Sequence, residues 1–102
     1  MKKIIDGKIY NTQTASNIAN WSNNLRNSDF GNLEETLYRT KKGQFFLFAN
    51  GGAATWCAQR SGNGSWAGEA IKLLSNDQAL EWCENRNICT DIVETIFTLA
   101  EG

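Results

Sequence analysis

Residues 33–50, LEETLYRTKKGQFFLFAN, predict two antiparallel strands that are joined by a tight turn at residues 41–44. Gly43 supplies the positive φ angle that a short hairpin connection needs. The run Asn50-Gly51-Gly52 then ends the second strand, because asparagine and glycine interrupt regular structure. The rest of the chain is therefore interpreted as elements that pair with this hairpin or cover it.

The second strand of this hairpin is apolar on both faces. Side chains alternate along a strand, so Phe45, Leu47 and Ala49 share one face. Phe46 and Phe48 point the other way. Such a strand is seldom left open to water, so we expect it at the centre of an antiparallel sheet. We expect helices to pack on one face of this sheet. The other face is expected to be covered by another segment, by a second copy of the chain or by a partner.

The N-terminal segment predicts a second hairpin and then a helix. Asp6-Gly7 between apolar residues is typical of a two-residue type I′ turn, so residues 2–10 are predicted to form a small hairpin. Thr12, or alternatively Asn11, is the predicted N-cap of a helix over residues 13–24. The helix is predicted from an apolar stripe at helical spacing, which consists of Ala15, Ile18, Trp21 and Leu25.

The segment after the central hairpin gives weaker signals. Residues 53–59 fit a short helix and a strand equally well. Residues 60–68, RSGNGSWAG, predict a loop, because Asn63-Gly64 is a turn dipeptide. Residues 71–74 then predict a short strand.

The C-terminal third predicts two helices. Ser75 and Gln78 form the pattern of a capping box, and the helix that they begin is predicted to end near Arg86. Asn87 suits the left-handed position after this helix, with Ile88 making the hydrophobic contact that follows. The apolar stripe of this helix is Ala79, Leu80 and Cys83, with Trp82 at its margin.

A last helix is predicted to be capped by Thr90. Its β-branched content favours a strand, but its spacing favours a helix with one apolar face. That face consists of Ile92, Val93, Ile96, Phe97 and Ala100. The whole chain, residues 1–102, is thus predicted to be a single α+β domain. An antiparallel sheet of about four to five strands, two hairpins included, packs with one early helix and two C-terminal helices.

The composition excludes several kinds of chemistry. The 102 residues contain no histidine, which removes Ser-His and Cys-His nucleophile pairs and most zinc sites. Cys57, Cys83 and Cys89 show no C-x-x-C spacing and are predicted to be reduced thiols packed as small hydrophobes. Glu34 and Glu35 point to opposite faces of a strand and are interpreted as edge or surface charges. We therefore predict a non-enzyme without catalytic residues, metal site or cofactor.

Charge and hydropathy favour a cytoplasmic protein that does not bind a membrane. No apolar run approaches the roughly 18 residues that span a bilayer, and no apolar segment follows Met1-Lys2-Lys3. The net charge of −1 is unevenly placed, because residues 73–102 contain six Asp/Glu and only one Lys/Arg. Such a distribution is typical of a solvated helical surface, and it can also steer a charged partner.

Two groups of residues are suited to binding. Basic residues beside Tyr38 and Phe45 form a pattern that binds RNA or single strands, although lysines also keep a hairpin tip soluble. Trp66 lies in a Gly/Asn/Ser-rich stretch and is either an interface anchor or a lid on the core. The candidate partner-binding residues are Arg39, Lys41, Lys42, Trp56, Arg60, Asn63 and Trp66.

Three stretches carry a resemblance to known proteins, and they are KKIIDGKIYNTQTA (2–15), SDFGNLEETLYRTKKGQFFLFANGGA (28–53) and GNGSWAGEAIKLLSNDQALEWCE (62–84). In that order and spacing, the chain resembles a family of small bacterial proteins found on phages, plasmids and integrated elements. The chain departs from the family pattern at residues 71–74, where a proline is expected, and at residues 56–58, where the family tends to have Tyr-Ala.

The resemblance implies an accessory protein of a mobile element, in the cytoplasm of a bacterial host. Within this group, anti-CRISPR proteins that act on the type II effector nuclease are the class it favours. The expected function is a non-enzymatic inhibitor that binds this effector and blocks guide RNA loading or nucleic-acid access, in indirect competition with the guide. The alternatives are an RNA- or single-strand-binding accessory protein and a homo-oligomeric regulatory or structural protein, such as a homodimer.

Overall fold

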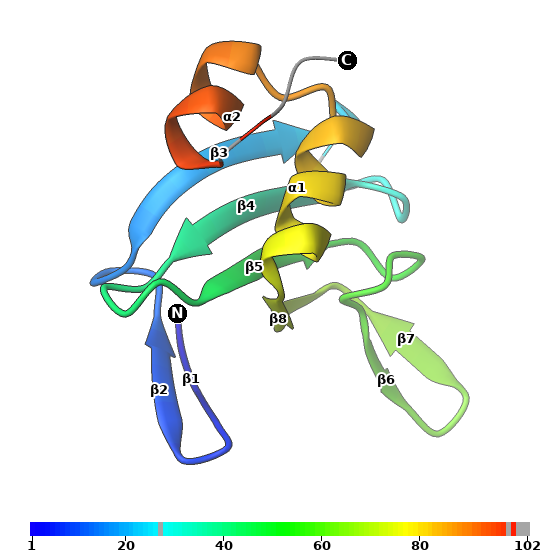
Figure 1. The fold of residues 1–102 in the computed structure, drawn as a ribbon. Coiled ribbons are helices and arrows are strands. Elements are labelled where there is room, and N and C mark those ends of the chain that lie inside the picture. The colour runs from blue at the N-terminus through cyan, green and yellow to red at the C-terminus, as the bar shows by residue number, and fades with distance from the viewer. Residues whose placement is uncertain (27, 98, 100–102) are drawn as a thin grey trace.

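The computed structural model describes residues 1–26, 28–97 and 99, and it has an α+β fold (Figure 1). Within these residues, four strands form an antiparallel sheet in the order β3-β4-β5-β8, and four others form the separate hairpins β1–β2 and β6–β7. The two C-terminal helices follow the last strand. The strands are β1 Lys2–Ile5, β2 Lys8–Asn11, β3 Ser16–Ser22, β4 Leu33–Arg39, β5 Phe45–Gly51, β6 Gln59–Ser61, β7 Gly64–Trp66 and β8 Gly68–Leu74, and the helices are α1 Asn76–Asn85 and α2 Thr90–Ile96.

The structure confirms the central hairpin. β4 and β5 pair in antiparallel register, with Leu33 opposite Gly51 and Arg39 opposite Phe45. Gly43 has a φ angle of +92°, the left-handed region that its lack of a side chain permits. β5 also pairs with β8 along its other edge. The strand that is apolar on both faces therefore lies inside the sheet, as predicted.

The helix predicted over residues 13–24 is wrong, because this segment contains β3, an outer strand of the sheet. Ile18 and Trp21 are three residues apart, yet both pack against the same core cluster. The register of β3 shifts between Asn17 and Ala19, so an extra residue interrupts the two-residue alternation there. A bulged strand can thus imitate helical spacing, and the serine and asparagine residues around it favour non-helical backbone.

Neither predicted N-cap starts a helix. Asn11 is the last residue of β2, and its Oδ1 accepts a hydrogen bond of 2.9 Å from the Gln13 N–H. Thr12 is tied to the N-terminus instead: its N–H donates to the Met1 carbonyl at 3.0 Å, and the Met1 amino group donates to Thr12 Oγ1 at 2.8 Å. These bonds close the open end of the N-terminal hairpin.

The structure confirms the N-terminal hairpin and shows where it packs. Asp6 and Gly7 have φ angles of +51° and +75°, as a type I′ turn requires. Tyr10 of β2 is buried and meets Phe46 of β5 edge to face, with ring centroids 5.7 Å apart. This hairpin is therefore the segment that covers part of the second face of the sheet. Phe48, on the same face, is half-buried, and a homodimer through this face stays a prediction.

The segment after β5 differs from both interpretations of residues 53–59. It is a turn segment that ends where β6 begins at Gln59. The Thr55 hydroxyl is buried and donates to the Gly52 carbonyl at 2.8 Å, which holds the turn. The loop predicted over residues 60–68 is wrong for most of its length, because this segment belongs to the hairpin β6–β7, which begins at Gln59 and turns at Gly62-Asn63. Strands of three residues are too short to leave a periodic sequence signal.

The predicted ends of the first helix are confirmed. Ser75 and Gln78 form the capping box of α1. At the other end, Asn87 has a φ angle of +53°, its N–H donates to Glu84, and the Ile88 N–H donates to Cys83 at 3.0 Å. These two bonds are those of a Schellman motif.

The second helix begins one residue earlier than predicted. Its N-cap is Cys89 rather than Thr90, and that position makes no side-chain cap hydrogen bond. The helix ends at Ile96, and the Phe97 ring stacks on Phe45 with centroids 5.3 Å apart. Ala100, which was predicted to continue the apolar face, lies outside the described residues.

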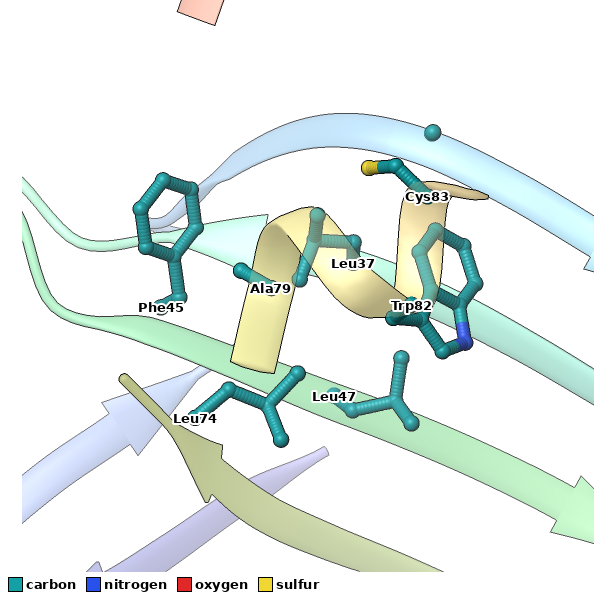
Figure 2. Packing of buried hydrophobic residues seen from close by; sticks show 8 residues of the cluster. Leu37, Phe45, Leu47, Leu74, Ala79, Trp82 and Cys83 are labelled. Carbon is teal, nitrogen blue, oxygen red and sulfur yellow. The ribbon is translucent and has the colours of Figure 1, made fainter. Parts of the chain in front are cut away.

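The core lies on both faces of the sheet. On the first face, α1 places Ala79, Trp82 and Cys83 over Leu37 and Leu47 (Figure 2). On the second face, a smaller cluster is covered by the β1–β2 hairpin, and its buried members are Tyr10, Phe46 and Ile71. No helix among the described residues is long and apolar enough to cross a membrane.

Candidate functional site

The candidate binding residues fall into two groups at opposite ends of the central strands (Figure 1). Lys41 and Lys42 are exposed in the turn between β4 and β5. Beyond the other end of β5 come Trp56 and the β6–β7 hairpin, which carries Arg60, Asn63 and Trp66. The structure therefore separates the basic tip from the tryptophan group, and each has to be considered as a surface of its own.

Arg39 and Tyr38 do not extend the basic tip into one basic and aromatic surface. The Arg39 guanidinium lies 5.1 Å from the centroid of the Phe45 ring, on the face that the helices cover. The Tyr38 ring stacks on Phe46 at 5.2 Å, on the opposite face. Adjacent residues of a strand point to opposite faces, so these two side chains cannot act on one ligand.

Lys41 and Lys42 instead share a groove with the N-terminal hairpin. The groove has a volume of about 560 Å³ and contains a third lysine, Lys8 of β2. Lys8 was not among the predicted binding residues, because the Asp6-Gly7 signal predicts the hairpin but not where the hairpin packs. We call this the basic groove; its lining is Gly7, Lys8, Ile9, Tyr10, Asn11, Thr14, Ala15, Thr40, Lys41, Lys42 and Gln44.

The β6–β7 hairpin presents a tryptophan to solvent. Trp66 is 55% exposed, and the hairpin extends away from the sheet (Figure 1). A Cβ atom at Gly64 would lie 2.5 Å from Cη2 of the Trp66 ring, so the ring lies directly against the Gly64 backbone. The Ser65 hydroxyl donates to the Ala53 carbonyl at 2.6 Å and ties the hairpin to the preceding turn. Trp66 is thus held against its own hairpin while most of its surface stays open.

Trp56 is partly structural, because its indole N–H donates to a buried carboxylate. Its Nε1 lies 2.8 Å from Oε2 of Glu35, which is only 3% exposed. The other carboxylate oxygen, Oε1, accepts from Trp82 Nε1 at 2.9 Å and from Arg86 Nε at 2.9 Å. Arg86 Nη2 lies 2.8 Å from the same oxygen and completes an ion pair.

The Arg86 guanidinium also packs over an aromatic ring, since its Cζ atom lies 3.6 Å from the centroid of Trp21. A buried carboxylate is tolerated only when it is paired and hydrogen-bonded, and here both oxygens have donors. The interpretation of Glu35 as an edge or surface charge is therefore wrong, whereas Glu34, its neighbour, is exposed. We call Glu35, Arg86, Trp21, Trp56 and Trp82 the Glu35 network.

The three cysteines of the chain differ in their burial. Within residues 1–26, 28–97 and 99, no three His, Cys, Asp or Glu side chains gather where they could hold a metal ion. Burial raises the pKa of the Cys83 thiol, and the negative charge of Glu84 adds to the shift. Cys57 is buried as well, but Cys89 is exposed, so the prediction of three packed thiols is wrong for Cys89.

A thiol reagent is expected to react with Cys89 faster than with the two buried cysteines. In the native protein at mildly alkaline pH, Cys89 reacts rapidly, because only the thiolate reacts and Cys83 has both a raised pKa and little access. All three react in concentrated guanidinium chloride. The measurement is the absorbance of the released thiol leaving group with time. A rapid native phase that survives Cys89→Ser would contradict this assignment.

Comparison with family models, with curated proteins and with solved structures gives no match. The two exposed surfaces, the basic groove and the β6–β7 hairpin, are therefore judged by their own chemistry. One offers positive charge in a concave site, and the other offers an aromatic anchor on a projecting hairpin. These are different kinds of binding surface, so each can be tested with variants that leave the other unchanged.

Proposed function

We propose that this chain is a non-enzymatic inhibitor that binds a type II CRISPR effector nuclease of a bacterial host. It acts by covering a surface of that protein, so that guide RNA loading or nucleic-acid access is blocked. The target class comes from the resemblance of residues 2–15, 28–53 and 62–84 to proteins of mobile elements. The proposal requires no catalytic residue, metal or cofactor of this chain.

The observation that supports a binding role is the exposed Trp66 on the β6–β7 hairpin. Tryptophan and arginine are the usual anchors of protein interfaces, and Arg60 lies on the paired strand. The ring is already fixed against Gly64, so binding loses less side-chain entropy than it would with a freely rotating anchor. A projecting hairpin of this kind can enter a concave surface of a larger partner.

The uneven charge suits a partner that binds nucleic acid. α1 and α2 contain Asp77, Glu81, Glu84, Asp91 and Glu94, and they form one layer on the first face of the sheet. A protein channel that holds guide RNA is positively charged, so an acidic layer is attracted to it. This layer would then occupy the place of the RNA phosphates, which gives the indirect competition with the guide.

Co-purification of the tagged chain with a type II effector tests the proposal directly. We expect capture of the effector before guide RNA is added and weaker capture afterwards, because the guide occupies the charged channel. Capture that is equal before and after loading would place the contact outside the channel and contradict guide competition. Recovery of neither form would contradict the proposed function.

Trp66→Ala is expected to weaken this capture strongly. Truncation of an interface anchor costs roughly 2 kcal/mol or more, which is about a 30-fold loss of affinity. Ile4→Ala on β1 is the matched control, since Ile4 is also an exposed apolar residue but lies outside both the β6–β7 hairpin and the helical layer. The affinities are measured by surface plasmon resonance on immobilised effector. Equal affinities for both variants and the parent chain would exclude Trp66 as an anchor.

A further inference from the structure

We propose that the basic groove binds the phosphodiester backbone of single-stranded nucleic acid. This inference does not depend on the proposed nuclease binding. The groove is lined by residues of β2 and of the β4–β5 turn, and these elements lie at the opposite end of the sheet from the β6–β7 hairpin (Figure 1). It rests on the charge, the shape and the hydrogen-bonding capacity of the groove.

The charge of the groove is uniformly positive. Lys8, Lys41 and Lys42 line it and are exposed, and no acidic residue in the described part of the chain shares the lining. Lys2 and Lys3 lie on the adjoining strand of the same hairpin, where the one acidic residue is Asp6, in the turn. Three lysines that line one groove suit an anion with repeated charges, which is what a phosphodiester chain provides.

The walls of the groove are held in place by the fold. On one side, the Tyr10 ring packs on Phe46 and fixes β2 against the sheet. On the other side, the Gly43 N–H donates to the Thr40 carbonyl at 2.9 Å and the Thr40 N–H donates to the Gln44 carbonyl at 2.9 Å. Lys8 therefore extends from a strand that packs on the sheet, and Lys41 and Lys42 extend from a hydrogen-bonded turn, although the lysine side chains themselves stay flexible.

The groove also has neutral donors and an apolar wall. Thr40 Oγ1 accepts from the Gln44 N–H at 3.1 Å, so this hydroxyl keeps its own hydrogen for a ligand oxygen. Ile9 is 62% exposed and lines the same groove, which offers an apolar surface to a base or a sugar. A volume of about 560 Å³ lies in the usual range for small-molecule sites, which leaves room for a short stretch of a strand.

The charge distribution of the whole molecule favours this groove as the place where a strand binds. The acidic layer of α1 and α2 repels phosphate, whereas the N-terminal hairpin and the β4–β5 turn attract it. The same observations do not favour an acidic protein as the ligand. A nucleic-acid strand carries one charge at every nucleotide, whereas a protein carries a carboxylate only at its Asp and Glu residues.

The test is fluorescence anisotropy of a labelled oligouridylate with the full chain, over a range of salt concentrations. Three phosphate contacts on a single strand predict a slope of about −2 in a plot of log affinity against log salt, since each contributes about −0.7. A labelled mononucleotide in parallel should bind much more weakly, because it offers fewer contacts. Equal binding of both probes would reduce the site to a general phosphate site and overturn the proposal of a strand.

Charge reversal provides matched variants. Lys41→Glu and Lys42→Glu should each weaken strand binding about tenfold and flatten the salt slope, whereas Lys72→Glu should change it less than about twofold. Lys72 is an exposed lysine of β8 on the helix-covered face, away from the groove. Each variant replaces one lysine with glutamate, so all three have the same net charge. Circular dichroism checks that each is folded. An equal loss with Lys72→Glu, or no binding of the parent chain at low salt, would overturn the proposal.

Discussion

Glu35→Ala is expected to lower the free energy of unfolding by about 3 kcal/mol, the lower end of the range for breaking a buried ion pair, because Glu35 is buried but the Arg86 side chain stays 29% exposed. Arg86 then loses the carboxylate at 2.8 Å, and the indole N–H groups of Trp56 and Trp82 lose their acceptor. A buried donor without a partner adds its own desolvation cost. Urea denaturation followed by tryptophan fluorescence measures this change.

Glu34→Ala is the matched control for this prediction. Glu34 is the neighbouring carboxylate on the same strand, but it is exposed and points to the opposite face. Its removal should change the unfolding free energy by about 0.5 kcal/mol or less, as is usual at exposed positions. If the two alanine variants were equally stable, the Glu35 network would contribute nothing to the fold, and Trp56 would be free to act as a binding residue alone.

The Glu35 network could not be predicted from the sequence, because its members are far apart in the chain. Glu35 is 47 residues from Trp82 and 51 residues from Arg86, and nothing in the local pattern of either segment indicates the contact. Glu35 also follows the polar Glu34, which resembles an ordinary exposed pair. Figure 1 shows α1 crossing one face of the sheet, and the hydrogen bond from Trp82 places the Glu35 carboxylate on that face. Such a crossing is a tertiary property.

Features that depend on a few adjacent residues could be predicted. The Asp6-Gly7 turn, the β4–β5 hairpin and the Ser75–Gln78 capping box are each specified by local backbone preferences. β3 could not be predicted in the same way. Its apolar residues Ile18 and Trp21 reach the same core cluster because of a bulge, and the bulge forms only when β3 pairs with β4.

The same limit applies to the candidate binding residues. The exposed positions of Lys41 and Lys42 could be predicted, since a turn places side chains in solvent. The sequence left Trp66 open between an interface anchor and a lid on the core, and the structure shows it exposed. The groove around the two lysines could not be predicted, because it forms only when Lys8 is brought beside them by the packing of Tyr10. Local sequence thus predicts which side chains are exposed, and tertiary packing decides which of them share a ligand.

Phe46→Ala tests that packing and is expected to cost about 3–5 kcal/mol of stability, as for other fully buried phenylalanines. Phe46 is 0% exposed, and the centroid of its ring lies 5.7 Å from that of Tyr10 and 5.2 Å from that of Tyr38. Its loss removes the contact that fixes the N-terminal hairpin on the sheet. Amide hydrogen exchange should therefore accelerate in β1 and β2 more than in β4, in addition to the fall in global stability measured with urea.

Phe48→Ala separates this effect from a general loss of apolar area. Phe48 lies on the same strand and the same face as Phe46 but is half-buried, so its truncation should cost less than half as much. It should also leave exchange in β1 and β2 close to that of the parent chain. If both variants released the hairpin equally, Tyr10 would not be its anchor. Lys8 would then have no fixed position beside Lys41, and the basic groove would have only one rigid wall.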